Sequence, residues 1–392
     1  MKRFRAAGAL VTWLVGVGIW DSGFGIGDSA VAGQAASPRL LVVLVADQLR
    51  ADYIDTYRHR WSGGLRTLLD EGAWFTRAEY PYLNTATCVG HVTIATGALP
   101  RTHGIVLNRW WHRDEQRSFN CMDDELSPDV SYGGPVRSGN SAKRGLVPTL
   151  ADELRVQRPA GRVVARALKA RAAIALAGHG GDAVTWFDES GRTFVTSRAF
   201  APAPVESVAR FIGRNPPEAD HGKTWTLREP PDTYRDPDIT PGERPKAGWT
   251  AVFPHAIVGA AGPDAQYFDR WQKSPFSDAY LGRLASWLVD DLQLGQRQTT
   301  DYLAVSFSAL DLMGHDFGTD TREVEDMLIR LDDTIGALLA HLDARVGRDT
   351  SAVALPAVHG AAPTPEQPGG GHIASEDIQQ LVEQELTTHW GP

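Results

Sequence analysis

Cysteine and basic clusters are scarce in this sequence of 392 residues, and each shortage excludes a class of protein. The two cysteines, Cys88 and Cys121, are too few for a disulfide scaffold, although they could pair in an oxidising compartment. The net charge is −9 and no basic stripe or run is present, so we expect no nucleic-acid partner. What remains is an ordinary globular composition with enough apolar residues for a sizeable core.

The N-terminal segment has the pattern of a secretory signal peptide. Residues 1–5 are basic, residues 6–20 are apolar, and residues 30–32 supply small side chains for cleavage. A membrane anchor is the alternative, but the apolar run is short for a bilayer span and is interrupted by glycines. We therefore expect residues 1–32 to be removed, which leaves a periplasmic or secreted protein without stable membrane insertion.

Apolar, β-branched runs alternate with helical patterns along the rest of the chain. Strands are predicted at 40–46, 162–168, 183–187, 301–307 and 351–355, and helices at 65–71, 88–96 and 321–342. This alternation predicts an α/β fold, a three-layer sandwich around a mostly parallel sheet, spanning residues 33–392. Residues 215–254 are rich in proline and charge, so we expect part of the region 188–275 to be an inserted cap.

Ligand-type side chains follow three of the predicted strands. Asp47 and Asp311 come after two strands and His359 comes after a third. Because ligands bind outside the carboxyl ends of parallel strands, these side chains are expected at one edge of the sheet. Carboxylate and imidazole groups together suit zinc, although each residue alone is more typical of a turn or a helix cap.

The segments 82–97 and 100–108 are the most specific in the chain. They resemble the nucleophile segment of the alkaline phosphatase superfamily, in the branch that holds type I phosphodiesterases and threonine-dependent bacterial alkaline phosphatases. The resemblance implies that Thr87, and not Thr85, is the nucleophile, and that Asn108 binds phosphate. A hydroxyl at a helix N-terminus is compatible with that role, because the helix dipole favours negative charge there. From the residues alone, a plain helix cap is the more typical role for Thr87.

The segment 167–187 resembles the phosphomonoesterase members of this superfamily. In those members a Lys-x-Arg pair contacts the phosphoryl oxygens, which places this role on Lys169 and Arg171, and two cations favour a dianionic monoester. The same resemblance implies two zinc ions. Asp311 and His315 would bind one, while Asp47, Thr87 and His359 would surround the other. Hydrolysis would then pass through a phosphothreonine.

Two departures from the family pattern concern the metal sites. Val358 stands where the family has an aspartate, and we expect the chain to be shortened at its C-terminus, before the last zinc-binding histidine of the pattern. The resemblance gives His91, His103 and His179 no ligand role, so we expect them to be structural. The leading interpretation is a zinc phosphomonoesterase acting on a small phosphate ester. A phosphodiesterase or nucleotide pyrophosphatase, and a degenerate homologue with impaired metal binding, are the alternatives.

Overall fold

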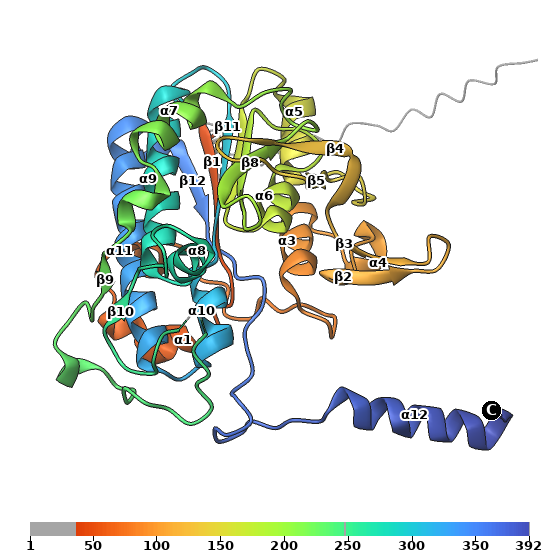
Figure 1. Cartoon of the computed structure of the whole chain (residues 1–392). Coiled ribbons are helices and arrows are strands. Elements are labelled where there is room, and N and C mark those ends of the chain that lie inside the picture. The colour runs from red at the N-terminus through yellow and green to blue at the C-terminus, as the bar shows by residue number, and fades with distance from the viewer. Residues whose placement is uncertain (1–36, 247, 392) are drawn as a thin grey trace, which may run out of the picture. The chain divides into compact units, whose positions relative to one another are not determined.

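A computed structural model describes residues 37–246 and 248–391 (Figure 1). The predicted signal peptide, residues 1–32, lies outside the described residues. Among the helices that are described, none combines the length and the apolar character needed to cross a membrane.

The centre of the fold is an eight-stranded sheet with the strand order β12-β1-β11-β6-β7-β8-β4-β5. The strands from β12 to β7 run parallel, and β8, β4 and β5 pair antiparallel. The bounds of these strands are β1 Leu40–Ala46, β4 Asp123–Ser131, β5 Gly139–Asn140, β6 Val163–Ala167, β7 Ala183–Asp188, β8 Thr193–Ser197, β11 Asp301–Phe307 and β12 Ser351–Ala354. All five predicted strands are confirmed, and they form the parallel part.

Helices cover both faces of the sheet, so the predicted three-layer α/β architecture is confirmed (Figure 1). Along β1, Val42 and Leu44 point into one core while Val43 and Val45 point into the other. Because successive side chains of β1 enter a core on either face of the sheet, every position of this strand is apolar. One face packs against α9 and α11, and the opposite face packs against α3, α5 and α6.

The helices include the three that were predicted, at 65–71, 88–96 and 321–342, with small shifts at their ends. Their bounds are α1 Ala51–Tyr57, α2 Gly64–Glu71, α3 Thr87–Thr96, α4 Pro100–His103, α5 Leu150–Gln157, α6 Ala170–Ala177, α7 Glu206–Arg214, α8 Ala265–Gln272, α9 Pro275–Asp291, α10 Ala309–Phe317, α11 Arg322–Arg345 and α12 Ser375–Trp390. Short ribbons are formed by β2 Arg109–His112 with β3 Arg117–Asn120, and by β9 Thr224–Trp225 with β10 His255–Ala256.

The proline-rich segment 215–254 packs against α11. The indole nitrogen of Trp225 and the hydroxyl of Tyr234 both donate hydrogen bonds to the buried carboxylate of Asp326, at 2.6 and 2.5 Å. A buried carboxylate needs such donors, because its desolvation is otherwise uncompensated. The segment has little regular secondary structure of its own, and these hydrogen bonds fix it against α11.

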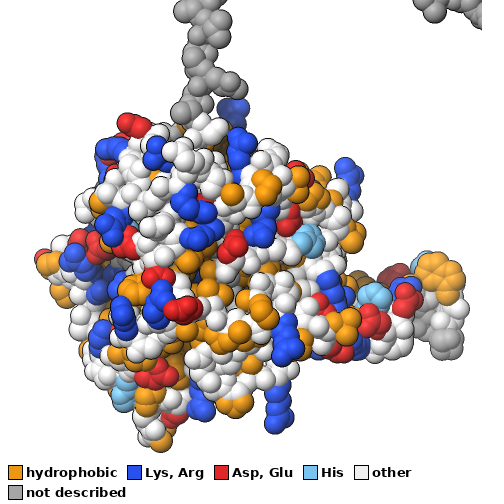
Figure 2. Space-filling view, turned by 90° about the horizontal axis from the view of Figure 1, so that it is seen from above, with side chains coloured by type: hydrophobic (Ala, Val, Ile, Leu, Met, Phe, Trp, Pro, Cys, Tyr) orange, Lys and Arg blue, Asp and Glu red, His pale blue; other side chains and the backbone are white. Residues whose placement is uncertain are grey.

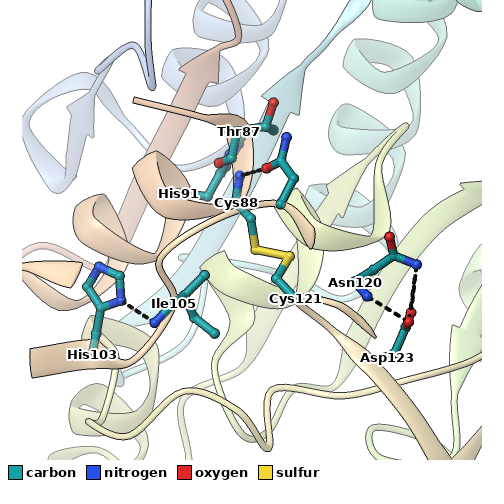
Figure 3. The surroundings of a disulfide bond; sticks show 9 residues. Thr87, Cys88, His91, His103, Ile105, Asn120, Cys121 and Asp123 are labelled. Carbon is teal, nitrogen blue, oxygen red and sulfur yellow. Dashed lines mark hydrogen bonds between the residues drawn. A yellow bond between two sulfur atoms is a disulfide. The ribbon is translucent and has the colours of Figure 1, made fainter. Parts of the chain in front are cut away.

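A disulfide joins Cys88, the second residue of α3, to Cys121 in the turn between β3 and β4 (Figure 3). The pairing that the sequence left open is therefore present. The backbone N–H of Cys88 also donates a hydrogen bond to the side-chain oxygen of Asn108, at 2.8 Å. The N-terminus of α3 is thus tied both to the β2–β3 ribbon and to Asn108.

A buried carboxylate holds the start of α10. Asp278, in the first turn of α9, accepts hydrogen bonds from the backbone N–H groups of Ser308 and Ala309 at 3.1 and 3.3 Å. Burial is the main cause that raises the pKa of Asp278 to about 7 from its ordinary 3.8, and the two backbone donors offset it only in part. The first turn of α10, which carries Asp311, is therefore anchored by a group that titrates near neutrality.

Replacing both cysteines, as Cys88→Ser with Cys121→Ser, should lower the free energy of unfolding by about 2–4 kcal/mol, because the cross-link no longer restricts the unfolded chain. Urea denaturation measures this change. The wild-type protein with a reductant should match the variant, and thiol labelling of the denatured, unreduced wild type should find no free thiol. Two reactive thiols per chain would contradict the disulfide.

Asp278→Asn should remove a pH dependence of stability. Because the folded-state pKa of Asp278 is above the unfolded one, the folded protein keeps this proton longer, and wild-type stability falls as pH rises from about 4 to about 7. The variant should therefore gain stability relative to the wild type over this range, by urea denaturation in the presence of EDTA.

Asp291→Asn, at the other end of α9, is the matched control. The neighbouring Ser207 hydroxyl and Arg210 guanidinium lower the pKa of Asp291, so it is ionised in both the folded and the unfolded state above pH 5. The free energy of unfolding of that variant should not increase relative to the wild type between pH 5 and 7. Equal pH profiles for the wild type and Asp278→Asn would contradict the assignment.

Candidate active site at the carboxyl edge of the sheet

Four neighbouring parallel strands each deliver one side chain to the same edge of the sheet. In the strand order β12-β1-β11-β6, the residues that follow are His359, Asp47, Asp311 and Lys169. Asp47 continues directly from β1, and its backbone N–H bonds to Phe307 at the end of β11. The predicted meeting of Asp47, Asp311 and His359 is confirmed, because their ligand atoms all lie within 4.8 Å of one another.

The ammonium group of Lys169 lies between the two carboxylates. Its Nζ is 2.5 Å from Oδ2 of Asp47, and it forms a second short ion pair with Oδ2 of Asp311. All three side chains are buried. Burial alone would raise the pKa of Asp47, but the charge of Lys169 and the nearby His359 outweigh it and hold this pKa well below its usual range. Asp47 is therefore an anion at every physiological pH.

The imidazole of His359 faces the other oxygens of the same carboxylates. Its Nε2 lies 3.2 Å from Oδ1 of Asp47 and 3.8 Å from Oδ1 of Asp311. The same nitrogen lies 3.3 Å from the hydroxyl oxygen of Thr87. Burial lowers the pKa of His359, but the adjacent carboxylate of Asp47 prevails and raises it above its ordinary value.

Thr87 is the first residue of α3, and the N-cap position belongs to Ala86, which has no capping side chain. The helix-cap alternative for Thr87 is therefore wrong, and its hydroxyl points to His359 instead. Behind it, Nδ1 of His91 contacts the Thr87 carbonyl oxygen at 2.7 Å, and Nε2 contacts the Ser306 hydroxyl at 2.8 Å. Burial lowers the pKa of His91 to about 4, so this histidine is a neutral support of the α3 terminus.

The remaining predicted residues lie around this centre. Asn108 reaches α3 through the N–H of Cys88, next to Thr87. The side chain of His315 is 67% exposed, and its Nε2 lies 3.5 Å from Oδ1 of Asp311. Arg171, in the first turn of α6, forms no hydrogen bond or ion pair with another described residue, and its buried Nε is unpaired.

Two other histidines make structural contacts away from this centre. His103 contacts the hydroxyl of Thr93 and accepts from the N–H of Ile105. His179 contacts the carboxylate of Asp152 at 2.8 Å. Together with His91, they have the structural environments that were expected of them.

The donor set fits one divalent cation. Two carboxylates and one imidazole converge on a common point, and carboxylate and imidazole are ligands that zinc accepts. Oδ1 of Asp47 is buried and has no hydrogen-bond partner among the described residues, which leaves a lone pair for a cation. Val358 supplies no ligand. It is fully buried in the apolar core beside α3, in close contact with Gly90.

Sequence reasoning missed Gln48, which shapes the site from within. Its Nε2 donates to Oδ1 of Asp311 at 3.2 Å, and its backbone has a φ of 65°. Its Oε1 lies only 2.0 Å from where a β-carbon on Gly314 would be, so a side chain there would displace it. No pattern in the sequence marks this contact, because it joins residues from separate strands and a non-glycine residue with positive φ is uncommon.

Comparison with solved structures supports the fold. The structure is similar to the crystal structure of the alkaline phosphatase PafA, with a TM-score of 0.80 and 28% sequence identity over 91% of this chain and 69% of that one.

Comparison with curated proteins gives the same picture. The chain is 31% identical to the alkaline phosphatase PhoV of Synechococcus elongatus over 88% of its own length and 64% of that protein. It is 32% identical to the alkaline phosphatase PhoK of a Sphingomonas species over 90% of its own length and 60% of that protein. The chain therefore spans less than two thirds of the length of these relatives.

The family model for type I phosphodiesterases / nucleotide pyrophosphatases matches residues 41–389, which is most of the chain. This match includes the α3 segment with Thr87 and the four strands that supply the central side chains, β1, β6, β11 and β12. The chain belongs to the type I phosphodiesterase / nucleotide pyrophosphatase family, and bacterial alkaline phosphatases are among its relatives.

Proposed function

We propose that this protein is an exported hydrolase of phosphate monoesters and that Thr87 is its nucleophile. The single observation that carries the proposal is the position of the Thr87 hydroxyl. It lies at the N-terminus of α3 and 3.3 Å from His359, beside a buried cluster of two carboxylates and one ammonium. The similarity to PhoV, PhoK and PafA, each named as an alkaline phosphatase, supports the choice of reaction.

The reaction has two displacements at phosphorus. In the first, the Thr87 oxygen loses its proton and forms a bond to phosphorus, while the bond from phosphorus to the ester oxygen breaks and the alcohol leaves after protonation. In the second, water attacks phosphorus, the bond to the Thr87 oxygen breaks, and inorganic phosphate is released. A zinc ion bound by Asp47, Asp311 and His359 would supply positive charge that favours the threonine alkoxide and the phosphoryl oxygens.

The chain's own groups contribute orientation and charge. The N-terminus of α3 favours an anion next to Thr87, since the first N–H groups of a helix are directed there and the dipole is positive. Asn108, whose oxygen is fixed by the N–H of Cys88, directs its amide group toward the same end of the helix. Lys169 adds a fixed positive charge, and the unpaired Arg171 is free to meet a phosphoryl oxygen.

Export and substrate size are parts of the same proposal. The disulfide between Cys88 and Cys121 is typical of an oxidising compartment such as the periplasm or the extracellular space. On the face seen in Figure 2, basic side chains are interspersed with acidic and uncharged ones. The positive charge that would bind phosphate is buried at Lys169, which suits a small phosphate ester.

Thr87→Ala should reduce the kcat for an aryl phosphate by roughly 10³-fold or more, because no other hydroxyl occupies this position. Release of the aryl alcohol from 4-nitrophenyl phosphate measures it. Thr85→Ala is the matched control, since Thr85 is exposed two residues earlier, and it should keep near wild-type activity. If Thr87→Ala changes no measurable rate, the degenerate-homologue interpretation replaces this proposal.

The preference for monoesters should be measurable as a ratio of kcat/KM values. We expect a higher kcat/KM for 4-nitrophenyl phosphate than for the matching methyl diester, because a dianion gains more from Lys169 and Arg171 than a monoanion does. Arg171→Ala should lower this ratio, since it removes charge without touching Asp47 or Asp311. A wild-type ratio in favour of the diester would support a phosphodiesterase or nucleotide pyrophosphatase instead.

A further inference from the structure

The two buried carboxylates of the site each direct one oxygen to Lys169 and the other toward His359. Oδ2 of Asp47 and Oδ2 of Asp311 both bind the ammonium of Lys169. Oδ1 of each faces Nε2 of His359 instead, at 3.2 and 3.8 Å. The cluster therefore has an ammonium face, made by the two Oδ2 atoms, and an imidazole face, made by the two Oδ1 atoms.

We propose that this site binds a single divalent cation on its imidazole face, and that Lys169 permanently supplies the positive charge on its ammonium face. The proposal rests on the proposed function, but it concerns only how many ions the site holds. It departs from the two zinc ions that the family resemblance implies. Its basis is the arrangement of this chain's own charged groups.

The imidazole face has the properties of a cation site. Asp47, Asp311 and His359 all present a ligand atom there, within 4.8 Å of one another. Oδ1 of Asp47 is buried and has no hydrogen-bond partner among the described residues, so a metal ion bound to it would offset its desolvation. A cation that it shared with Asp311 and His359 would satisfy it.

The ammonium face is already occupied by the Lys169 side chain. Both Oδ2 atoms are engaged by the same Nζ, and Lys169 is itself buried. Lys169 is also the residue that precedes α6, so its backbone position is set by β6 and α6 together. The fold therefore holds the ammonium group of Lys169 within the cluster.

Position 358 supplies no further charge. Val358 lies next to the ligand His359, but it is fully buried among the apolar residues beside α3. A β-carbon on Gly90 would lie 2.7 Å from the β-carbon of Val358, so α3 and this segment are packed against each other at van der Waals distance. An apolar side chain in this place can neither bind a cation nor balance one.

The charge balance favours one ion. Two carboxylates carry two negative charges, and Lys169 cancels one of them. One divalent cation leaves a single net positive charge, which suits an anionic phosphate ester. Two divalent cations would leave three positive charges in a buried cluster, and uncompensated buried charge is unfavourable.

Zinc titration of the metal-free protein tests the stoichiometry directly. The wild-type protein is stripped with EDTA, titrated with Zn²⁺ by isothermal calorimetry, and analysed for bound zinc by mass spectrometry after gel filtration. We expect one zinc ion per chain. Asp311→Asn should lose it, whereas Asp70→Asn, which removes an exposed carboxylate on α2, should keep it. Two tight equivalents in the wild type would overturn the proposal, as would unchanged binding in Asp311→Asn.

Lys169→Met tests the role of the ammonium. It keeps the length of the side chain but removes its charge, so repulsion between the ammonium and the bound cation disappears. Zinc affinity should rise by about tenfold or more, and Lys169→Arg, which keeps the charge, should not show this rise. Weaker or unchanged affinity in a folded Lys169→Met protein would overturn the role of Lys169, and circular dichroism establishes that it is folded.

These measurements do not depend on turnover. If one zinc ion binds as expected and Thr87→Ala has no effect on phosphatase rate, the proposed function fails while the single-cation site stands. If Thr87→Ala abolishes activity and two zinc ions bind, the reverse holds. The two proposals are therefore separable by experiment.

Discussion

The buried ion pairs of Lys169 with Asp47 and Asp311 connect three neighbouring strands, and the geometry of the candidate site depends on them. A lysine ammonium without partners would be too costly to bury, and so would two adjacent carboxylates. Each group is acceptable only because the others are present. The chain segments that follow β1, β6 and β11 are therefore constrained to meet at one place, and His359 joins them from β12.

A second constraint acts on α3. The disulfide, the bond from Cys88 to Asn108 and the buried His91 all act on the first turns of this helix. They fix Thr87 at a helix N-terminus while leaving its hydroxyl directed to His359. Thr87 is thus held by covalent and hydrogen-bonded contacts that do not involve the carboxylate cluster.

Much of this arrangement could be predicted from the sequence, for reasons that are local. The run 40–46 is apolar at every position, which is characteristic of a strand covered on both faces, and Asp47 ends it abruptly. The same logic located Asp311 and His359 at the carboxyl edge. The motif around Thr87 identified the helix, which the structure confirms, and the family, which the family-model match confirms. Helix ends differed by a few residues, because several residue types are compatible with a helix terminus.

The contacts between distant residues could not be predicted in this way. Gln48 donates to Asp311 across 263 positions of the chain, and Asp278 anchors the start of α10 across 30. Nothing near either residue in the sequence indicates its partner, because such contacts arise only when the strands have been ordered in the sheet.

The sequence by itself determined the strands, the α3 helix, the family, and the side chains that end at one edge of the sheet. Only the tertiary structure decided that Lys169 lies between Asp47 and Asp311, and that each carboxylate presents one oxygen to Lys169 and the other to His359. The physical reason is that a pattern along the chain records which faces are buried and which residues follow a strand. The pairing of buried charges is set by the order β12-β1-β11-β6, which no local pattern contains.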